Sequence, residues 1–205
     1  QHYKLNSKNH DQIMTEYFLY TQNLFNDHDI DLLIWPETVI SNFILDNSVY
    51  FSTLKQLSMA NDVSILFGTP KRGDKGYFNS AVLLDQGVTQ SYEKYKLMPF
   101  GEYWPLRSFF TAIGLDRFVP GADFSSGNRI FPLRYRDYRI GLAICLESGF
   151  GHHYRYLTKS HDTDLFVAIT NTAWFGSSWI AETNFRLGVM RAVENGRFFF
   201  QASNR

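Results

Sequence analysis

The chain has 205 residues, which is enough for one sizeable hydrophobic core. Its 20 Lys and Arg balance its 20 Asp and Glu, so no overall field favours nucleic acid or an anionic membrane surface. A single cysteine excludes an internal disulfide, and no apolar run approaches the roughly 18 residues of a membrane helix. We therefore expect a single domain, residues 1–205, with no nucleic-acid partner.

The first half of the chain alternates between helical and extended patterns. Apolar residues recur at helical spacing in two segments and form short buried runs in four others. The helices are predicted over 9–25 and 48–60, and the strands over 31–35, 63–67, 80–84 and 88–94. The last two strands form a hairpin about Asp85-Gln86-Gly87, and residues 71–76 are predicted to be a solvated turn.

The second half begins with a long irregular section, residues 99–129, that is rich in Gly, Pro and aromatic residues. Such a section exceeds the usual loop length of a compact domain, so we predict a lid or binding loop. The later pattern predicts strands over 139–144, 165–170 and 198–203, and a helix over 181–195. The alternation of strands and helices predicts an α/β layered fold with mixed sheets.

Three chemically complementary groups follow three separate apolar strands: Glu37, Lys94 and Cys145. Strand ends in α/β folds converge where ligands bind, so these groups are predicted to meet in space. A thiol attacking a carbonyl carbon needs a proton acceptor, which Glu37 supplies, and a cation, which Lys94 supplies. Lys94 and the backbone N–H of Leu146 are predicted to stabilise the oxyanion, with no metal and no cofactor required.

Each of these residues also has a purely structural interpretation. A lone cysteine at a strand end is often a buried small hydrophobe. Glu37 after Trp-Pro also fits a turn cap, and Lys94 fits an ordinary exposed charge. Taken singly, none of the three indicates catalysis.

Their local sequences favour catalysis because they form a recognisable series. The segments are Trp35-Pro36-Glu37-Thr38, Tyr92 to Glu102 with its Pro-Phe-Gly-Glu end, Ile144-Cys145-Leu146-Glu147, Asn171-Thr172-Ala173-Trp174-Phe175-Gly176 and Met190 to Arg197. In this order they resemble the nitrilase superfamily of carbon–nitrogen hydrolases over nearly the whole chain. Within it they look most like the extracytoplasmic domain of the bacterial apolipoprotein N-acyltransferases.

The resemblance implies a fold and a set of roles. The expected fold is an α-β-β-α sandwich of two mixed sheets with helices outside, cut at both ends as a fragment of a longer membrane protein. Glu37 is implied to be the general base, Lys94 the oxyanion-stabilising lysine and Cys145 the nucleophile. Glu102, Glu147 and the Leu146 amide are implied to support them. For Glu102 and Glu147, a loop-fixing bond and an exposed turn carboxylate remain alternatives.

By resemblance, a fatty acyl group passes from a phospholipid to Cys145 as a thioester, and then to the terminal amine of a diacylglyceryl-cysteine lipoprotein. The implied location is the extracytoplasmic face of the bacterial inner membrane, with attachment through transmembrane segments absent from this chain. Tyr103 and Trp104 are expected to lie on a loop at the membrane interface that admits acyl chains, and Trp174 and Phe175 are expected to line the acyl cavity. Core packing remains the alternative for these four residues and for Phe109 and Phe110.

This chain departs from the family pattern at three positions. Leu146 stands where Tyr is usual, Lys96 where His is common, and Thr172 where Asp is usual. Two alternatives stay open, and the departures at Leu146 and Thr172 favour the second of them. One is a soluble amidase of the same superfamily, which passes the acyl group to water, and the other is a catalytically idle domain that faces lipid.

Overall fold

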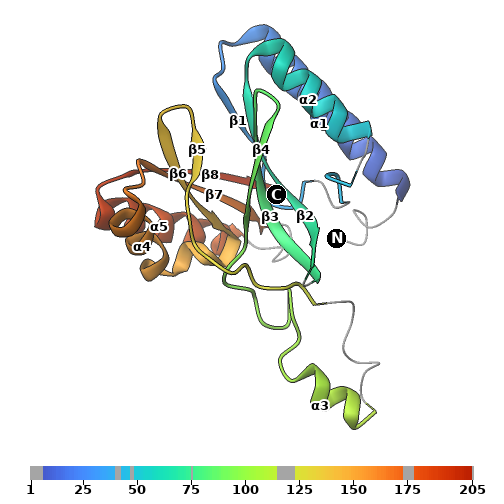
Figure 1. The fold of residues 1–205 in the computed structure, drawn as a ribbon, viewed down its shortest axis with the longest axis vertical. Helices are drawn as coiled ribbons and strands as arrows, with labels where there is room; N and C mark the ends of the chain where they lie inside the picture. The colour runs from blue at the N-terminus through green and yellow to red at the C-terminus, as the bar shows by residue number, and fades with distance from the viewer. Residues whose placement is uncertain are drawn as a thin grey trace.

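The computed structural model describes residues 7–39, 43–46, 49–74, 76–114, 123–172 and 178–204. They form two four-stranded mixed sheets packed face to face, with helices on the two outer faces (Figure 1). The expected α-β-β-α sandwich is therefore confirmed.

The first sheet has the strand order β1-β2-β3-β4. Its strands are β1 (Leu32–Ile34), β2 (Ser64–Gly73), β3 (Gly76–Asp85) and β4 (Val88–Glu93). β1 runs parallel to β2, and the other neighbours are antiparallel. The predicted hairpin turn is present, since Gln86 and Gly87 both have positive φ, as a two-residue turn between paired strands requires.

The second sheet has the order β5-β6-β7-β8. Its strands are β5 (Leu133–Tyr135), β6 (Tyr138–Ile144), β7 (Leu165–Asn171) and β8 (Phe198–Asn204). β5 pairs antiparallel with β6, while β6, β7 and β8 are parallel. A short 3₁₀ turn, η2 (Cys145–Gly149), follows β6 directly, and we call it the cysteine turn.

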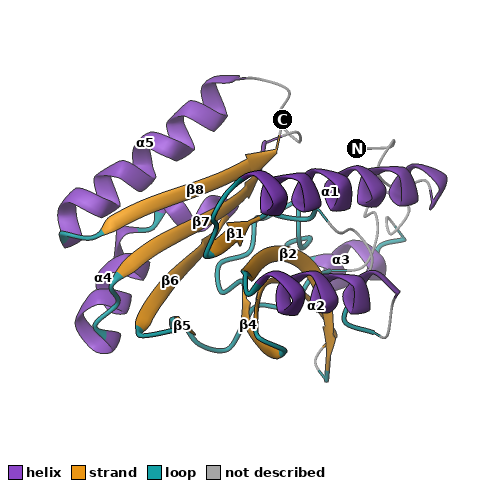
Figure 2. Cartoon of the chain, turned by 90° about the horizontal axis from the view of Figure 1, so that it is seen from above, coloured by secondary structure: helices purple, strands orange, loops and turns teal. Residues whose placement is uncertain are grey.

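Two pairs of helices cover the sandwich. α1 (Ser7–Asp27) and α2 (Val49–Asn61) lie on one side of the strands, and α4 (Gly151–His161) and α5 (Ser178–Asn195) on the other (Figure 2). A shorter helix, α3 (Arg107–Ala112), stands away from the body of the molecule (Figure 1).

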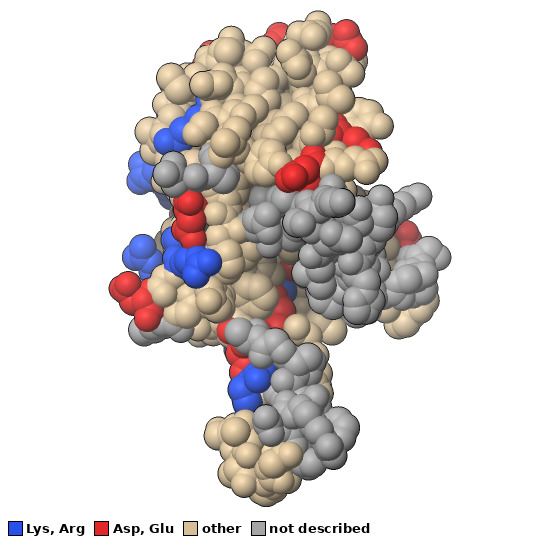
Figure 3. Space-filling model, turned by 90° about the vertical axis from the view of Figure 1, so that its right-hand side faces the viewer, with Lys and Arg blue, Asp and Glu red and all other residues tan. Residues whose placement is uncertain are grey.

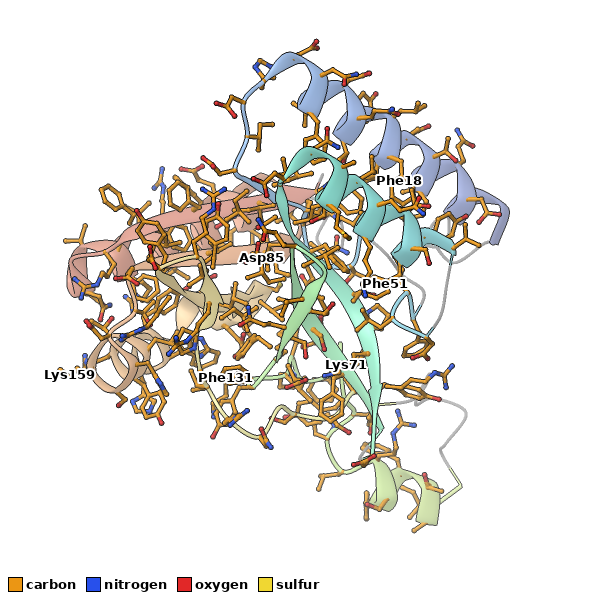
Figure 4. The ribbon with its side chains drawn as sticks, turned by 45° about the horizontal axis from the view of Figure 1, so that its top comes forward. Phe18, Phe51, Lys71, Asp85, Phe131 and Lys159 are labelled. Atoms are coloured by element: carbon orange, nitrogen blue, oxygen red, sulfur yellow. The ribbon has the colours of Figure 1, made fainter. Side chains whose placement is uncertain are left out.

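The strands alternate their side chains between a central layer and two outer layers. Leu66 of β2 and Ile144 of β6 belong to the layer between the sheets, whereas Phe67 faces α1 and α2, and Ala143 faces α4. Phe18 of α1 and Phe51 of α2 extend the outer cluster of the first sheet (Figure 4). Each fully buried large apolar side chain contributes about 1.5–3 kcal/mol, so packing in these layers fixes the sandwich.

The turn predicted over 71–76 is wrong for most of its length. β2 continues through Pro70 to Gly73, with Pro70 opposite Asn79 of β3. The carbonyl of Asn79 accepts from Lys94 N on the β4 side, so Pro70 and Asn79 form a pair without backbone hydrogen bonds between them. The missing N–H of Pro70 then costs no bond of the ladder.

Candidate active site

The residues predicted to carry the chemistry lie at one end of the sandwich and come from both sheets. Glu37 follows β1, Lys94 follows β4, and Cys145 follows β6 as the first residue of the cysteine turn. Glu37 is 5% exposed and Lys94 is 2% exposed, while Cys145 is partly exposed. The structure therefore brings a carboxylate, an ammonium and a thiol to one edge of the core.

Close backbone packing places Glu37. The N–H of Trp35 donates to Leu66 O at 2.7 Å, which extends the β1–β2 pairing beyond the last residue of β1. Gly68 then lies against the chain, because a Cβ at this position would be 2.6 Å from Glu37 Cα. The segment that carries Glu37 thus requires glycine at position 68.

Two carboxylates surround the buried ammonium. Lys94 Nζ lies 2.8 Å from Glu102 Oε2 and 3.7 Å from Glu37 Oε1. The second oxygen of Glu37 accepts the backbone N–H of Asn171 at 2.8 Å, and Glu102 Oε2 also accepts the N–H of Met98 at 2.8 Å. Glu102 therefore fixes its own loop and contacts Lys94 as well.

Asn79 joins the same cluster, although its sequence position predicts an ordinary turn residue. It lies within β3 and is 7% exposed. Its Nδ2 donates to Glu37 Oε1 at 2.8 Å and to Glu102 Oε1 at 2.6 Å. The signal in the sequence is a polar amide just before the apolar run 81–84 of the same strand.

Burial and the neighbouring charges shift the pKa of Glu37 and of Lys94. Burial raises the pKa of Glu37, against the lowering effects of Lys94 and of the Asn79 hydrogen bond. Burial alone lowers the pKa of Lys94, but the charges of Glu37 and Glu102 reverse this, and the net pKa is raised. The ammonium of Lys94 is therefore firmly protonated between two carboxyl groups.

Cys145 is held as a neutral thiol. Burial, followed by repulsion from Glu37, raises the pKa of Cys145 from its ordinary value of 9.0 to about 12, while Lys94 and a hydrogen bond from Leu146 N–H act to lower it. Cys145 has φ 54°, a left-handed conformation that is strained for a residue with a side chain. The charges of Glu37 and Lys94 therefore act in opposite directions on the pKa of this partly exposed thiol.

Glu147 anchors the cysteine turn and is fully buried. Its Oε1 accepts from the Tyr92 hydroxyl at 2.9 Å, Tyr95 N at 2.8 Å and Lys96 N at 2.9 Å. Its Oε2 accepts from Ile144 N at 2.9 Å. The alternative of an exposed turn carboxylate is wrong, because this side chain ties the turn to the segment just after Lys94.

Thr172 has a structural partner at the edge of the site. Its hydroxyl donates to the backbone carbonyl of Asn204 at the end of β8. The side chain of Asn204 in turn donates to Glu37 O at 3.4 Å. Thr172, which stands where aspartate is usual in the family, therefore links the end of β7 to the end of β8, next to the backbone of Glu37.

An aromatic arm, which we define as residues 103–114, follows Glu102. Trp104 packs edge-on against Phe100, with ring centroids 5.3 Å apart, and against Phe110, at 6.3 Å. Tyr103 is partly buried next to them and forms an isolated β-bridge with Pro99. Tyr103 and Trp104 thus lie at the base of the arm, beside Glu102. Trp174 and Phe175, the two residues predicted to line the acyl cavity, lie outside the described residues.

The arm is clamped at its base and apolar further out. Arg107 forms two hydrogen bonds with Asp123, at 2.7 Å and 2.6 Å. Beyond this ion pair, residues 108–114 carry no charge, and Phe109 is 57% exposed, so an interpretation of Phe109 as core packing is wrong. Figure 3 shows blue and red atoms near the neck of the projection and tan, uncharged atoms among the described residues at its tip.

The part of the chain that the structure describes lacks two features. It contains no group of three or more His, Cys, Asp and Glu side chains arranged to hold a metal ion. None of its helices combines the length and the apolar character needed to cross a membrane.

The chain is similar to curated acyltransferases. An apolipoprotein N-acyltransferase of Pseudomonas aeruginosa is 29% identical over 199 residues, covering 94% of this chain and 38% of that protein. Another, of Vibrio cholerae, is 30% identical over 195 residues, covering 90% and 38%. The chain thus spans about 38% of the length of these relatives.

Solved structures share the fold at lower identity. A CN-hydrolase superfamily protein from Xanthomonas campestris, which carries an arsenic adduct in its active site, superposes with TM-score 0.69 at 19% identity. The superposition covers 94% of this chain and 69% of the Xanthomonas campestris chain. An amidase from Nesterenkonia sp. gives TM-score 0.66 at 20% identity, covering 95% and 70%.

The profile of the carbon–nitrogen hydrolase family provides the assignment, because it matches residues 8–205, nearly the whole chain. With this match, the sandwich fold and a cysteine at the nitrilase-type position, the chain belongs to the carbon–nitrogen hydrolase family of enzymes.

Proposed function

We propose that this chain is the catalytic domain of an apolipoprotein N-acyltransferase in which Glu37, Lys94 and Cys145 form the catalytic triad. One observation carries the proposal: Glu37 and the buried ammonium of Lys94 lie 3.7 Å apart at the end of the sandwich where Cys145 begins the cysteine turn. Relatives that bear this name match more than nine-tenths of the chain at about 29% identity. The remaining features refine the mechanism.

The raised pKa of Cys145 determines how the first half-reaction begins. At neutral pH the sulfur is protonated, so it cannot attack as a thiolate formed in advance. Its proton passes to Glu37 as the sulfur adds to the ester carbonyl of a phospholipid. Lys94 and Leu146 N–H stabilise the oxyanion that forms. The C–O bond then breaks, Glu37 returns the proton to the departing lysophospholipid, and a thioester remains.

The second half-reaction uses the same groups. The terminal amine of a diacylglyceryl-cysteine lipoprotein adds to the thioester carbonyl, and Glu37 accepts a proton from the amine. Collapse of this intermediate breaks the C–S bond, and Cys145 regains its proton from Glu37. A thioester is the better acyl donor to an amine than the original ester, so two easier steps replace one difficult step.

The supporting glutamates and Asn79 act on this set without touching the reacting carbon. Glu102 holds Lys94 at 2.8 Å, and Asn79 holds Glu37 and Glu102 at a fixed separation. Glu147 holds the cysteine turn against the end of β4. All three therefore act as positioning residues.

The apolar arm favours a lipid as the acyl donor. Leu106, Phe109 and Ile113 are all more than half exposed, which is costly for side chains that meet only water. The arm starts directly after Glu102, and Tyr103 and Trp104 lie at its base, so an acyl chain entering along it would reach the triad. The proposed place of action is the extracytoplasmic face of the bacterial inner membrane, where both lipid substrates are present.

The test is detection of the acyl-enzyme. The full-length protein is incubated with a phospholipid labelled in its acyl chain, and a thioester on Cys145 is sought by its sensitivity to hydroxylamine. We expect label on the wild type and none on Cys145→Ala. Hydrolysis of small amides without any lipid-derived thioester would assign the amidase function instead. Undiminished lipoprotein acylation by Cys145→Ala would point to an idle domain.

A further inference from the structure

Asn184 of α5 contacts the cysteine turn directly. Its Nδ2 donates to the backbone carbonyl of Cys145 at 3.3 Å. A backbone carbonyl is only an acceptor, so the nitrogen of the amide must face it. A residue 39 positions away in the sequence thus holds the carbonyl of the cysteine itself.

This carbonyl shares one rigid peptide unit with the N–H of Leu146. The unit is planar and trans, so its C=O and N–H point in opposite directions and rotate together. Any side chain that fixes the carbonyl of Cys145 therefore fixes the direction of the Leu146 N–H. That N–H already donates toward the sulfur of Cys145.

The peptide needs such an anchor because of the conformation of Cys145. The left-handed region is less favourable than the right-handed one for a residue with a Cβ, and Cys145 lies in it. A strained conformation of this kind persists where surrounding contacts hold it. Glu147 holds the turn from one side, through Ile144 N, and Asn184 holds it from the α5 side.

Asn184 is poorly suited to a role in stability alone. Among the described residues, its Oδ1 is buried without a hydrogen-bond partner. An unpaired buried acceptor is unfavourable, which offsets the weak bond that the Nδ2 of Asn184 makes. An apolar residue of similar size would avoid this cost, so the value of the amide lies in what it holds.

We propose that Asn184 is a positioning residue that fixes the Cys145–Leu146 peptide, and thereby aims the Leu146 N–H at the oxyanion of the acyl substrate. This inference rests on the proposed acyl transfer by Cys145. It assigns to α5 a part in orienting the Leu146 N–H, in addition to the oxyanion contact of Lys94 and the anchoring of the turn by Glu147.

The test separates oxyanion stabilisation from the general state of the thiol. In the full-length protein, Asn184→Ala and Asn184→Leu both remove the donor, and leucine keeps the volume in case the smaller residue impairs folding. We expect the rate of acyl-enzyme formation from labelled phospholipid to fall about a hundredfold, as for a misaligned reacting group, with KM unchanged. Alkylation of Cys145 by iodoacetamide forms no oxyanion, so its rate should fall far less than the acylation rate, only through the weakened hydrogen bond from Leu146 N–H to the sulfur.

Asn195→Ala is the matched control, because Asn195 of the same helix also donates its Nδ2 to a backbone carbonyl, that of Arg191, at 2.8 Å. This variant should keep the wild-type acylation rate. Wild-type acylation by both Asn184 variants would overturn the inference, as would equal losses in acylation and alkylation, which indicate a loosened turn. A wild type that forms no acyl-enzyme would instead refute the proposed function, and the inference with it.

Discussion

The hydroxyl of Tyr92 donates to Oε1 of Glu147 at 2.9 Å, which joins a strand of the first sheet to the cysteine turn of the second. The same carboxylate oxygen accepts the N–H groups of Tyr95 and Lys96, directly after Lys94. One buried carboxylate therefore sets the distance between the segment that bears the ammonium and the turn that bears the thiol.

Tyr92→Phe should destabilise the protein by about 1–3 kcal/mol, because Glu147 then loses one of its buried donors. Chemical denaturation monitored by circular dichroism measures the change. Tyr135→Phe is the matched control, since the Tyr135 hydroxyl is buried without a partner among the described residues and its removal should be close to neutral. Equal losses for the two variants would contradict this account of Glu147.

Glu37→Gln should separate thiol ionisation from acyl transfer. After burial, the charge of Glu37 is the largest factor that raises the pKa of Cys145, so removing that charge lowers this pKa. The thiolate is the reactive form, so the alkylation rate of Cys145 should rise at a given pH, and its pH profile should shift to lower pH. Acyl transfer should be lost, because no group then accepts the thiol proton.

The measurement compares iodoacetamide alkylation of wild type and Glu37→Gln between about pH 6 and pH 10. In the wild type, a pKa of about 12 in place of 9.0 leaves roughly a thousandth of the ordinary thiolate fraction. A variant that alkylates more slowly than the wild type would show that the charge of Glu37 favours the thiolate, contrary to the prediction.

Asn79→Ala should move the acidic limb of the activity profile to higher pH. The hydrogen bond from Asn79 lowers the pKa of Glu37, so its removal raises a pKa that burial has already raised. Glu37 acts as a base only when deprotonated, so activity appears only at a higher pH than in the wild type. The pH dependence of kcat/KM for acyl-enzyme formation measures this shift.

Asn61→Ala is a suitable comparison for Asn79→Ala. Asn61 is exposed and donates to Leu57 O at 2.8 Å, far from the site in the sequence. Its profile should coincide with that of the wild type. An Asn79→Ala profile with the same acidic limb, reduced only in height, would exclude control of Glu37 by this amide.

Phe109→Asp should weaken binding to phospholipid vesicles without changing the fold. Phe109 lies on the exposed, uncharged part of the arm, and a carboxylate there must stay in water. Vesicle co-sedimentation and the KM for phospholipid both measure the effect. Val88→Asp, at an exposed apolar residue in the β3–β4 hairpin, is the control and should bind as the wild type does.

The predictable part of the fold follows from side chains that are apolar in continuous runs. Residues 140–144 are buried, and Leu32–Ile34 pack against the apolar clusters on both faces of their sheet, so both strands show directly in the sequence. The sequence pattern does not predict helix α4, because the buried face of this helix includes His153 and Tyr154, which do not form an apolar pattern. Strand β5 has three residues and joins β6 through Arg136 at φ 50°, without the glycine that marks such turns.

The site divides in the same way between what the sequence reveals and what it conceals. Glu37, Lys94 and Cys145 stand out because ionisable groups directly after apolar strands are unusual. Asn79 and Asn184 are neutral amides whose meaning depends on partners 42 and 39 positions away. The full burial of Glu147 likewise depends on Tyr92, in the opposite sheet, and no local pattern encodes it.

The two sheets are each hydrogen-bonded within themselves and meet through side chains, while the reacting groups are contributed by both. Catalytic activity therefore depends strongly on how tightly the two sheets pack against each other. Under mildly denaturing conditions, a shift of one sheet relative to the other would separate the reacting groups and abolish activity. The strands and helices would still give a native far-ultraviolet circular dichroism spectrum. Heat inactivation should accordingly precede the loss of secondary structure.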